Sequence, residues 1–212
     1  MLSVHPYEPF VPQGAAKLII GTIPPYRFCI RPQELRDGDV NFYYGSRANA
    51  FWHLIEQATG ETFDFENTVK AVAQRKAFLE KRGIGMTDVV QSCVHQGGKS
   101  DDVSLQSIRP KPIGQLLAEH PLIETLIYTG RSAQNNSVMW LMNHHVADKG
   151  CHRSVGGKAA EKRVTVNGKT YNVILLYSPS PNALRGIDRE TRLEQYKQVF
   201  ASEDQIAKRA AT

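Results

Sequence analysis

Side chains suited to chemistry gather in four short motifs of this chain. An amide, Asn49, and a carboxylate, Asp88, stand in the second and third motifs, and the fourth carries two hydroxyls. The motifs are Gly21-Thr22-Ile23-Pro24, Asn49-Ala50-Phe51-Trp52, Gly83-Ile84-Gly85-Met86-Thr87-Asp88-Val89 and Ser178-Pro179-Ser180-Pro181-Asn182. The first and last each follow an apolar run typical of a strand, and open parallel sheets bind their ligands at the carboxyl ends of strands. We therefore expect chemistry at that edge of a sheet.

The elements that must position these motifs alternate between strand and helix patterns. Short apolar runs, each followed by a loop residue, predict strands at 17–21, 84–90, 125–129 and 173–177. Between them, Ser46 is placed to cap a helix that buries Phe51, a second helix is expected over 67–82, and Ser132 is placed to cap a third. The alternation predicts an α/β chain with a mainly parallel sheet.

The end of the chain carries two further local signals. Asn167-Gly168 separates two β-type runs, and this dipeptide suits the type I′ turn of a hairpin. The last strand should therefore have an antiparallel neighbour. From Asp188 onward, Leu193, Tyr196 and Phe200 recur at helical spacing, which predicts a closing amphipathic helix.

Two long segments, 91–112 and 149–160, show neither pattern and are expected to be loops. Loops of that length in a compact domain are either functional or disordered. Between Lys149 and Lys169 the chain has six Lys or Arg residues and one acidic residue, Glu161. This stretch either follows a phosphate backbone or is a solvated loop.

Bulk properties limit the class of protein. The chain has 212 residues, 41% of them hydrophobic, and no linker-like stretch divides it, so one domain over 1–212 is expected. No apolar run approaches the roughly 18 residues of a membrane span, and the start lacks the pattern of a secretion signal. These features predict a soluble, cytoplasmic protein. A formal charge of +5 and a pI near 9.1 favour a polyanionic partner.

The cysteines and histidines give no metal or disulfide pattern. Cys29, Cys93 and Cys151 are odd in number and scattered, which fits reduced thiols. The group His144, His145, Cys151 and His152 matches no zinc spacing, and three scattered cysteines cannot hold an iron-sulfur cluster. We expect no metal.

The order and spacing of the four motifs resemble those of the uracil-DNA glycosylase superfamily, and most closely its hypoxanthine-DNA glycosylase branch. The resemblance spans roughly residues 17–185. It implies a three-layer α/β/α sandwich that extrudes a deaminated base, hypoxanthine or uracil, from DNA and hydrolyses its N-glycosidic bond to leave an abasic site. It also implies a monomer that needs no cofactor, has DNA as its partner and is associated with the nucleoid.

The resemblance assigns the water-positioning role to Asn49. Many members hold an Asn or Asp at the position of Ile23, which cannot orient water, whereas the hypoxanthine branch uses the Asn of the second motif. The substrate-binding group would include Gly21, Thr22 and Ile23. The alternative for Asn49 is a satisfied residue at a helix start.

Asp88 falls where relatives use Asn to read the edge of the base. Uracil and hypoxanthine both present an N–H beside a carbonyl there. An ionised Asp88 accepts from the N–H and leaves the carbonyl to a nearby backbone N–H, whereas a protonated Asp88 donates instead. A third reading makes Asp88 a cap for the segment after the strand.

The fourth motif corresponds to the loop that enters the minor groove in relatives. Ser178 replaces a His that stabilises the departing base, and Ser180 would contact phosphate or the leaving group. The DNA-binding residues would be Pro179, Pro181, Asn182, Leu184 and Arg185, with Leu184 and Arg185 as the wedge, and Arg47 would touch phosphate. The alternative is a Pro-rich turn in which Leu184 simply packs.

Aromatic residues near the first two motifs are candidates for stacking on the extruded base. They are Tyr26, Phe28, Phe42, Tyr43 and Tyr44, of which Tyr26 and Phe28 are favoured. Two rivals to the leading function remain open at this point. One is a DNA-binding protein that kept the fold and lost catalysis, because Ile23 and Ser178 replace two residues most relatives use. The other is an enzyme acting on free nucleosides or RNA.

Overall fold

Two sheets organise the strands. The computed structural model describes residues 2–30, 34–99, 101–132, 134–149, 162–183 and 186–201. The larger sheet has the order β3-β2-β6-β8-β7, and the smaller has the order β1-β4-β5. The strands are β1 Leu2–Val4, β2 Lys17–Gly21, β3 Ile84–Asp88, β4 Val90–His95, β5 Leu105–Pro110, β6 Thr125–Tyr128, β7 Lys162–Val166 and β8 Lys169–Leu175.

Parallel pairing in the larger sheet brings the motifs to one edge. β2 pairs in parallel with β3 on one side and with β6 on the other, and β6 pairs in parallel with β8. The register sets Gly21, the last residue of β2, opposite Asp88, the last residue of β3. The carboxyl ends of these four strands therefore lie side by side, with the first, third and fourth motifs at or just beyond them.

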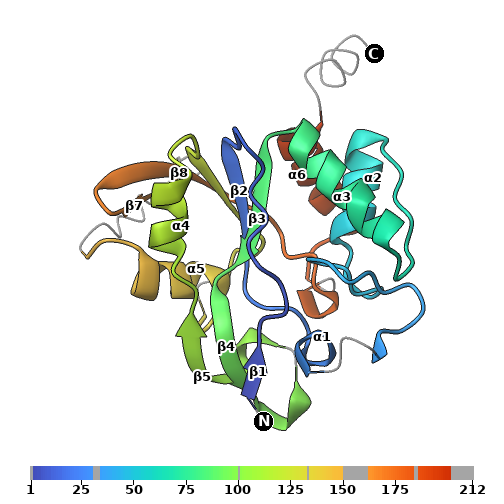
Figure 1. The fold of residues 1–212 in the computed structure, drawn as a ribbon, viewed down its shortest axis with the longest axis horizontal. Coiled ribbons are helices and arrows are strands. Elements are labelled where there is room, and N and C mark those ends of the chain that lie inside the picture. Colours follow the sequence, from blue (N-terminus) through green and yellow to red (C-terminus); the bar gives the residue numbers. More distant parts are fainter. Residues whose placement is uncertain are drawn as a thin grey trace.

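Helices cover both faces of the larger sheet because side chains alternate along its strands. Ile19 of β2 packs with α2, α3 and α6, while Leu18 and Ile20 pack with α4 and α5. Figure 1 shows these two groups on opposite sides of the strands, with the small sheet and α1 below. The helices are α1 Tyr26–Ile30, α2 Phe51–Thr59, α3 Val69–Lys81, α4 Ile113–Glu119, α5 Val138–Leu141 and α6 Arg189–Phe200.

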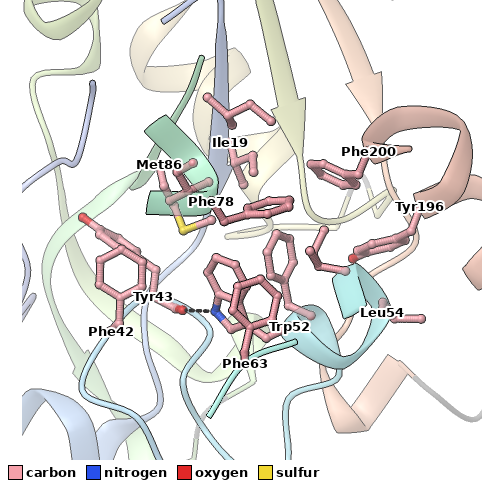
Figure 2. Packing of buried hydrophobic residues seen from close by; sticks show 14 of the residues in the cluster. Ile19, Phe42, Tyr43, Trp52, Leu54, Phe63, Phe78, Met86, Tyr196 and Phe200 are labelled. Carbon is pink, nitrogen blue, oxygen red and sulfur yellow. Dashed lines mark hydrogen bonds between the residues drawn. The ribbon is translucent and has the colours of Figure 1, made fainter. Parts of the chain in front are cut away.

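The second motif anchors the core on the α2 side. Phe51 and Trp52 are both at most 1% exposed, and Trp52 lies among the aromatic rings drawn in Figure 2. The indole N–H of Trp52 donates to the carbonyl of Tyr43 over 2.8 Å. The start of α2 therefore fixes the loop that carries Tyr44, one residue further on.

Several predictions from the sequence are confirmed. The strand at Lys17–Gly21 has the expected bounds, and α6 begins after Asp188, whose carboxylate accepts from the Thr191 N–H. The predicted hairpin joins β7 and β8 in antiparallel pairing. Asn167 and Gly168 have φ values of +50° and +78°, which a type I′ turn requires.

Other predictions were wrong. The segment 91–112 is not a loop, because most of β4 and all of β5 lie in it and, with β1, form an antiparallel sheet that the expectation of a mainly parallel sheet did not include. Ser46 does not cap α2, since its hydroxyl accepts from the Arg27 guanidinium instead. Ser137 rather than Ser132 caps α5. Within the described segments, no helix has the length and apolar content to cross a membrane.

The bond between Trp52 and Tyr43 yields a first prediction. Trp52→Phe keeps an aromatic ring but leaves the Tyr43 carbonyl without its donor, so the free energy of unfolding should fall by roughly 1–3 kcal/mol. Urea denaturation followed by circular dichroism measures this. Phe63→Leu, which changes an adjacent ring without touching that carbonyl, is the control for general loss of packing. Unchanged stability of Trp52→Phe would show that the bond contributes nothing.

Candidate active site

A cavity of about 680 Å³ opens at the carboxyl edge of the larger sheet. Its volume is within the roughly 300–1,000 Å³ of small-molecule sites. All four motifs contribute to its wall, together with the segment after β6 and the turn before β5. The lining includes Thr22, Ile23, Tyr44, Asn49, Asp88, Asp101, Asp102, Val103, Thr129, Arg131, Tyr177, Ser178, Pro179, Ser180 and Pro181.

Asn49 lies at the start of α2 and lines this cavity. Its side-chain carbonyl accepts from the Phe51 N–H over 2.9 Å, so the amide occupies the helix-start position that the sequence left open as an alternative. No partner for its NH2 group is present among the described residues. The next residue, Ala50, donates its N–H to the Pro179 carbonyl over 3.0 Å, which joins the second motif to the fourth.

Asp88 is only 4% exposed and is held by a chain of buried polar groups. The Nε2–H of His5 donates to Asp88 Oδ2 over 2.8 Å. The other ring nitrogen, Nδ1, lies 2.9 Å from the Tyr7 carbonyl oxygen, 3.1 Å from the Tyr7 backbone nitrogen and 3.2 Å from the Lys111 Nζ, so whether Nδ1 donates or accepts depends on the tautomer. Asp88 Oδ2 therefore accepts a hydrogen bond from the His5 ring.

Lys111 supplies the positive charge behind this chain. It is 5% exposed and also donates to the Tyr7 carbonyl. Burial lowers the pKa of Lys111, and the negative charges of Asp88 and Glu8 oppose that shift. The ammonium thus lies on the far side of the imidazole from the cavity, where it balances the buried carboxylate.

Gly21 allows polar atoms of two cavity-lining residues, Asp88 and Tyr44, to approach the same backbone position. A Cβ at Gly21 would lie 2.3 Å from Asp88 Oδ1 and 2.3 Å from the Tyr44 hydroxyl, distances that real Cβ atoms do not adopt. The carboxylate oxygen and the hydroxyl therefore both rest against the bare Cα of Gly21. An acceptor and a potential donor are set side by side.

Tyr44 is fixed in an unusual backbone conformation. Its φ is +55°, a left-handed value uncommon for residues other than Gly, Asn and Asp. Its ring stacks on Phe51 at a centroid distance of 4.4 Å, and its hydroxyl pairs with the Thr129 hydroxyl at 2.9 Å. Burial raises the pKa of Tyr44 well above the usual value, and the charge of Asp88 adds to the effect. The phenol therefore keeps its proton.

The loop that carries Tyr44 is organised by one buried carboxylate, Asp39. It forms an ion pair with Arg27 at 2.6 Å and accepts the backbone N–H groups of Arg36 and Arg47. Burial by itself would raise the pKa of Asp39. The hydrogen bonds from Arg27, Arg47 and Arg36 outweigh burial and hold that pKa below its ordinary value.

The fourth motif forms the opposite wall. Ser178 and Ser180 both line the cavity, and the Ser178 hydroxyl accepts from the Ser180 N–H over 3.2 Å. Pro181 is exposed at the start of the short turn Pro181–Ala183. The predicted wedge residues Leu184 and Arg185, and Cys151 and His152, lie outside the described residues. The side chain of Asn182 is not described.

Four described residues that were predicted to contact substrate or DNA do not line this cavity: Gly21, Tyr26, Phe28 and Arg47. Phe28 is 1% exposed and lies under the Arg27 guanidinium, and Tyr26 packs edge-on against His95. Arg47 is exposed and donates to the Asp37 carbonyl. The aromatic rings that do line the cavity are Tyr44 and Tyr177.

Sequence reasoning missed several polar residues in or behind the cavity, among them His5, Lys111, Asp102, Thr129 and Arg131. His5 and Lys111 belong to segments far from every motif, and Asp102 and Arg131 stand in loops. Asp102 accepts from the Thr22 hydroxyl over 3.1 Å, and the Arg131 guanidinium lies 4.5 Å above the Tyr177 ring. One local signal could have identified Asp102: it stands next to another acidic residue, Asp101, in the segment 91–112, which is unusually long for a loop.

The fold is similar to that of a solved structure. This is the solution NMR structure of a "putative Uracil DNA glycosylase" from Methanosarcina acetivorans, with a TM-score of 0.59 and 20% sequence identity over 94% of this chain and 97% of that chain. At such low identity the likeness concerns the fold alone. No protein-family model and no curated protein matches the chain significantly.

The role of Asp39 yields a second prediction, on stability and pH. Because its pKa is lowered on folding, its pairing stabilises the fold at neutral pH, and this contribution is lost as the pH falls through the lowered pKa. Asp39→Asn should therefore lower the free energy of unfolding at pH 7 by roughly 1.5–3 kcal/mol. The deficit should shrink below about pH 4, near the ordinary pKa of an aspartate.

Urea denaturation at several pH values measures this difference. Asp37→Asn, in the same loop, is the matched control for removing one negative charge. A deficit in Asp39→Asn that is the same at pH 3 and pH 7 would contradict the assigned role.

Proposed function

We propose that this protein is a DNA glycosylase that removes a deaminated base, hypoxanthine or uracil, and leaves an abasic site. The proposal takes the whole chain as one monomeric glycosylase domain. Its support is a cavity of suitable size at the carboxyl edge of the sheet, and a fold shared with a protein described as a glycosylase. The observation that carries it is the pair of polar atoms over Gly21.

This pair matches one pattern of base edge. Hypoxanthine and uracil each present a ring N–H beside a carbonyl. Asp88 Oδ1 would accept from the N–H, and the Tyr44 hydroxyl would donate to the carbonyl. Tyr44 also shares a hydrogen bond with Thr129 in which either hydroxyl can donate, so the proposal requires Tyr44 to turn its O–H to the base and accept from Thr129 when the base is bound. Adenine and cytosine present the reverse, a bare ring nitrogen beside an amino group. They would leave Asp88 facing a lone pair, which is costly in a buried site.

The remaining motif residues surround the bond to be cut. Asn49 offers its NH2 group to the attacking water, because its carbonyl is occupied by the start of α2. Ser178 and Ser180 lie on the other wall, where a hydroxyl stabilises the negative charge that builds up on the departing base. Thr22 and Ile23 complete the wall at the end of β2.

DNA would approach across the fourth motif. Pro179 and Pro181 stand beside the cavity, and the proposed wedge, Leu184 and Arg185, follows them with Asn182. Arg131, exposed above Tyr177, is added here as a phosphate contact. Arg47, which does not line the cavity, is proposed as a second phosphate contact.

The test is a panel of oligonucleotides, each with one modified base, incubated with the protein and cleaved by alkali. We expect abasic product from hypoxanthine or uracil and none from adenine or cytosine, in duplex or single-stranded DNA. Absence of product from every substrate, with DNA binding retained, would overturn the proposal in favour of a binding protein that lacks catalysis.

The role of Tyr44 yields a third prediction. Tyr44→Phe keeps the ring stacked on Phe51 and removes only the hydroxyl, so the single-turnover rate on the preferred base should fall roughly 10- to 100-fold. Tyr43→Phe is the matched control, because the Tyr43 hydroxyl donates to the Glu8 carbonyl behind the cavity. Equal losses in the two variants, or an unchanged rate in Tyr44→Phe, would remove Tyr44 from base recognition.

A further inference from the structure

The water that attacks a glycosidic bond must lose a proton, and a positioned base accelerates this step. An amide such as Asn49 can orient water but is not basic enough to hold that proton. At Asp88, one oxygen accepts from His5 and the other rests beside Tyr44 over Gly21. Ile23 is apolar. The four motifs therefore provide no side chain that is clearly suited to accept the proton of the attacking water.

We propose that Asp102, in the turn before β5, accepts the proton of the attacking water. This inference rests on the proposed glycosylase function. Asp102 lines the same cavity as Asn49 and Asp88, yet it comes from the short turn Asp102–Ser104 outside all four motifs. The hydrogen bond from the Thr22 hydroxyl places Asp102 against the first motif, in which the next residue, Ile23, is apolar.

The geometry holds the Asp102 carboxylate in place and leaves one of its oxygens able to accept a proton. Oδ2 accepts from the Thr22 hydroxyl over 3.1 Å, and no described residue donates to Oδ1. The Asp101 carboxylate caps the turn by accepting the Ser104 N–H over 3.0 Å, which orients the backbone at Asp102. Val103, 64% exposed, follows at the mouth of the cavity.

The electrostatic surroundings suit a base that works near neutral pH. Burial raises the pKa of Asp102 to about 6, the Thr22 hydrogen bond opposes the shift, and the charges of Asp88 and Asp101 add to it. Among the residues that the structure describes, no arginine of the cavity wall is paired with Asp102. Arg27 is paired with Asp39, Arg192 donates to the Ala183 carbonyl, and Arg131 lies over Tyr177.

The step balances with water as the only co-reactant. The N-glycosidic bond breaks and its electron pair leaves with the base. The water oxygen bonds to the anomeric carbon of the sugar, and the proton it loses passes to Asp102. The base anion takes up a proton from solvent after it leaves, and Asp102 returns its own to solvent.

Asp102→Asn is the primary test. It preserves shape and the bond to Thr22 but removes the base, so the single-turnover rate on the preferred substrate should fall at least about 100-fold. DNA affinity, measured by fluorescence anisotropy, should be unchanged. The wild-type rate should rise with pH to a plateau above about pH 6, and the variant should lose that rise.

Two neighbouring variants separate a base from a merely structural residue. Thr22→Val removes the hydrogen bond that lowers the Asp102 pKa, so the inflection in the rate should move to higher pH. Asp101→Asn keeps an oxygen for the turn and removes a negative charge, so the inflection should move to lower pH. A structural role would change rates without these opposite shifts.

The outcomes distinguish this inference from the function on which it rests. If the wild type cleaves a deaminated base and Asp102→Asn cleaves at the same rate with the same pH profile, only the role of Asp102 fails. If Asp102→Asn is slow, but Thr22→Val and Asp101→Asn do not move the inflection of the rate against pH, Asp102 is not the base. A wild type that cleaves nothing overturns both.

Discussion

The site depends on the close approach of Asp88 and Tyr44 over a glycine. Because Gly21 has no Cβ, a carboxylate from β3 and a phenol from the loop before α2 rest against the same backbone. The parallel register of β2 and β3 puts Gly21 opposite Asp88, so the contact follows from the sheet itself. Three features hold Tyr44 in place for this contact. They are its left-handed backbone, its stacking on Phe51 and the hydrogen bond from Trp52 to the Tyr43 carbonyl.

A buried carboxylate in this position requires compensation, and the fold supplies it from distant segments. His5 comes from the N-terminal segment and hydrogen-bonds Asp88 through Nε2, and Lys111, directly after β5, lies 3.2 Å from the other nitrogen of the same ring. The small antiparallel sheet brings these segments together, since β1 and β5 both pair with β4. That sheet is therefore part of the support for the site, although it lies at the margin of the fold.

Local patterns in the sequence predicted the larger sheet but not the smaller one. Lys17–Gly21 and the Asn167-Gly168 hairpin carry strong apolar or turn signals, whereas β5 is largely exposed, ends in Pro110 and contains Ser107 at φ +50°. Such a strand has no alternating pattern to detect. In the same way, motifs indicated Asn49, Asp88 and Ser178 for the cavity, but the contacts of His5, Lys111 and Asp102 arise only from tertiary packing. Tyr26 and Phe28 looked suited to stacking, yet α1 directs them away from the cavity.

The central claim is that Asp88 and Tyr44 form an acceptor and donor pair that reads one edge of a base. A crystal structure of the protein with free hypoxanthine tests it most directly. We expect the ring N–H within about 3 Å of Asp88 Oδ1 and the carbonyl oxygen within about 3 Å of the Tyr44 hydroxyl, which are ordinary hydrogen-bond lengths. Hypoxanthine bound elsewhere, or bound in the cavity with that edge turned away from both groups, would contradict the account.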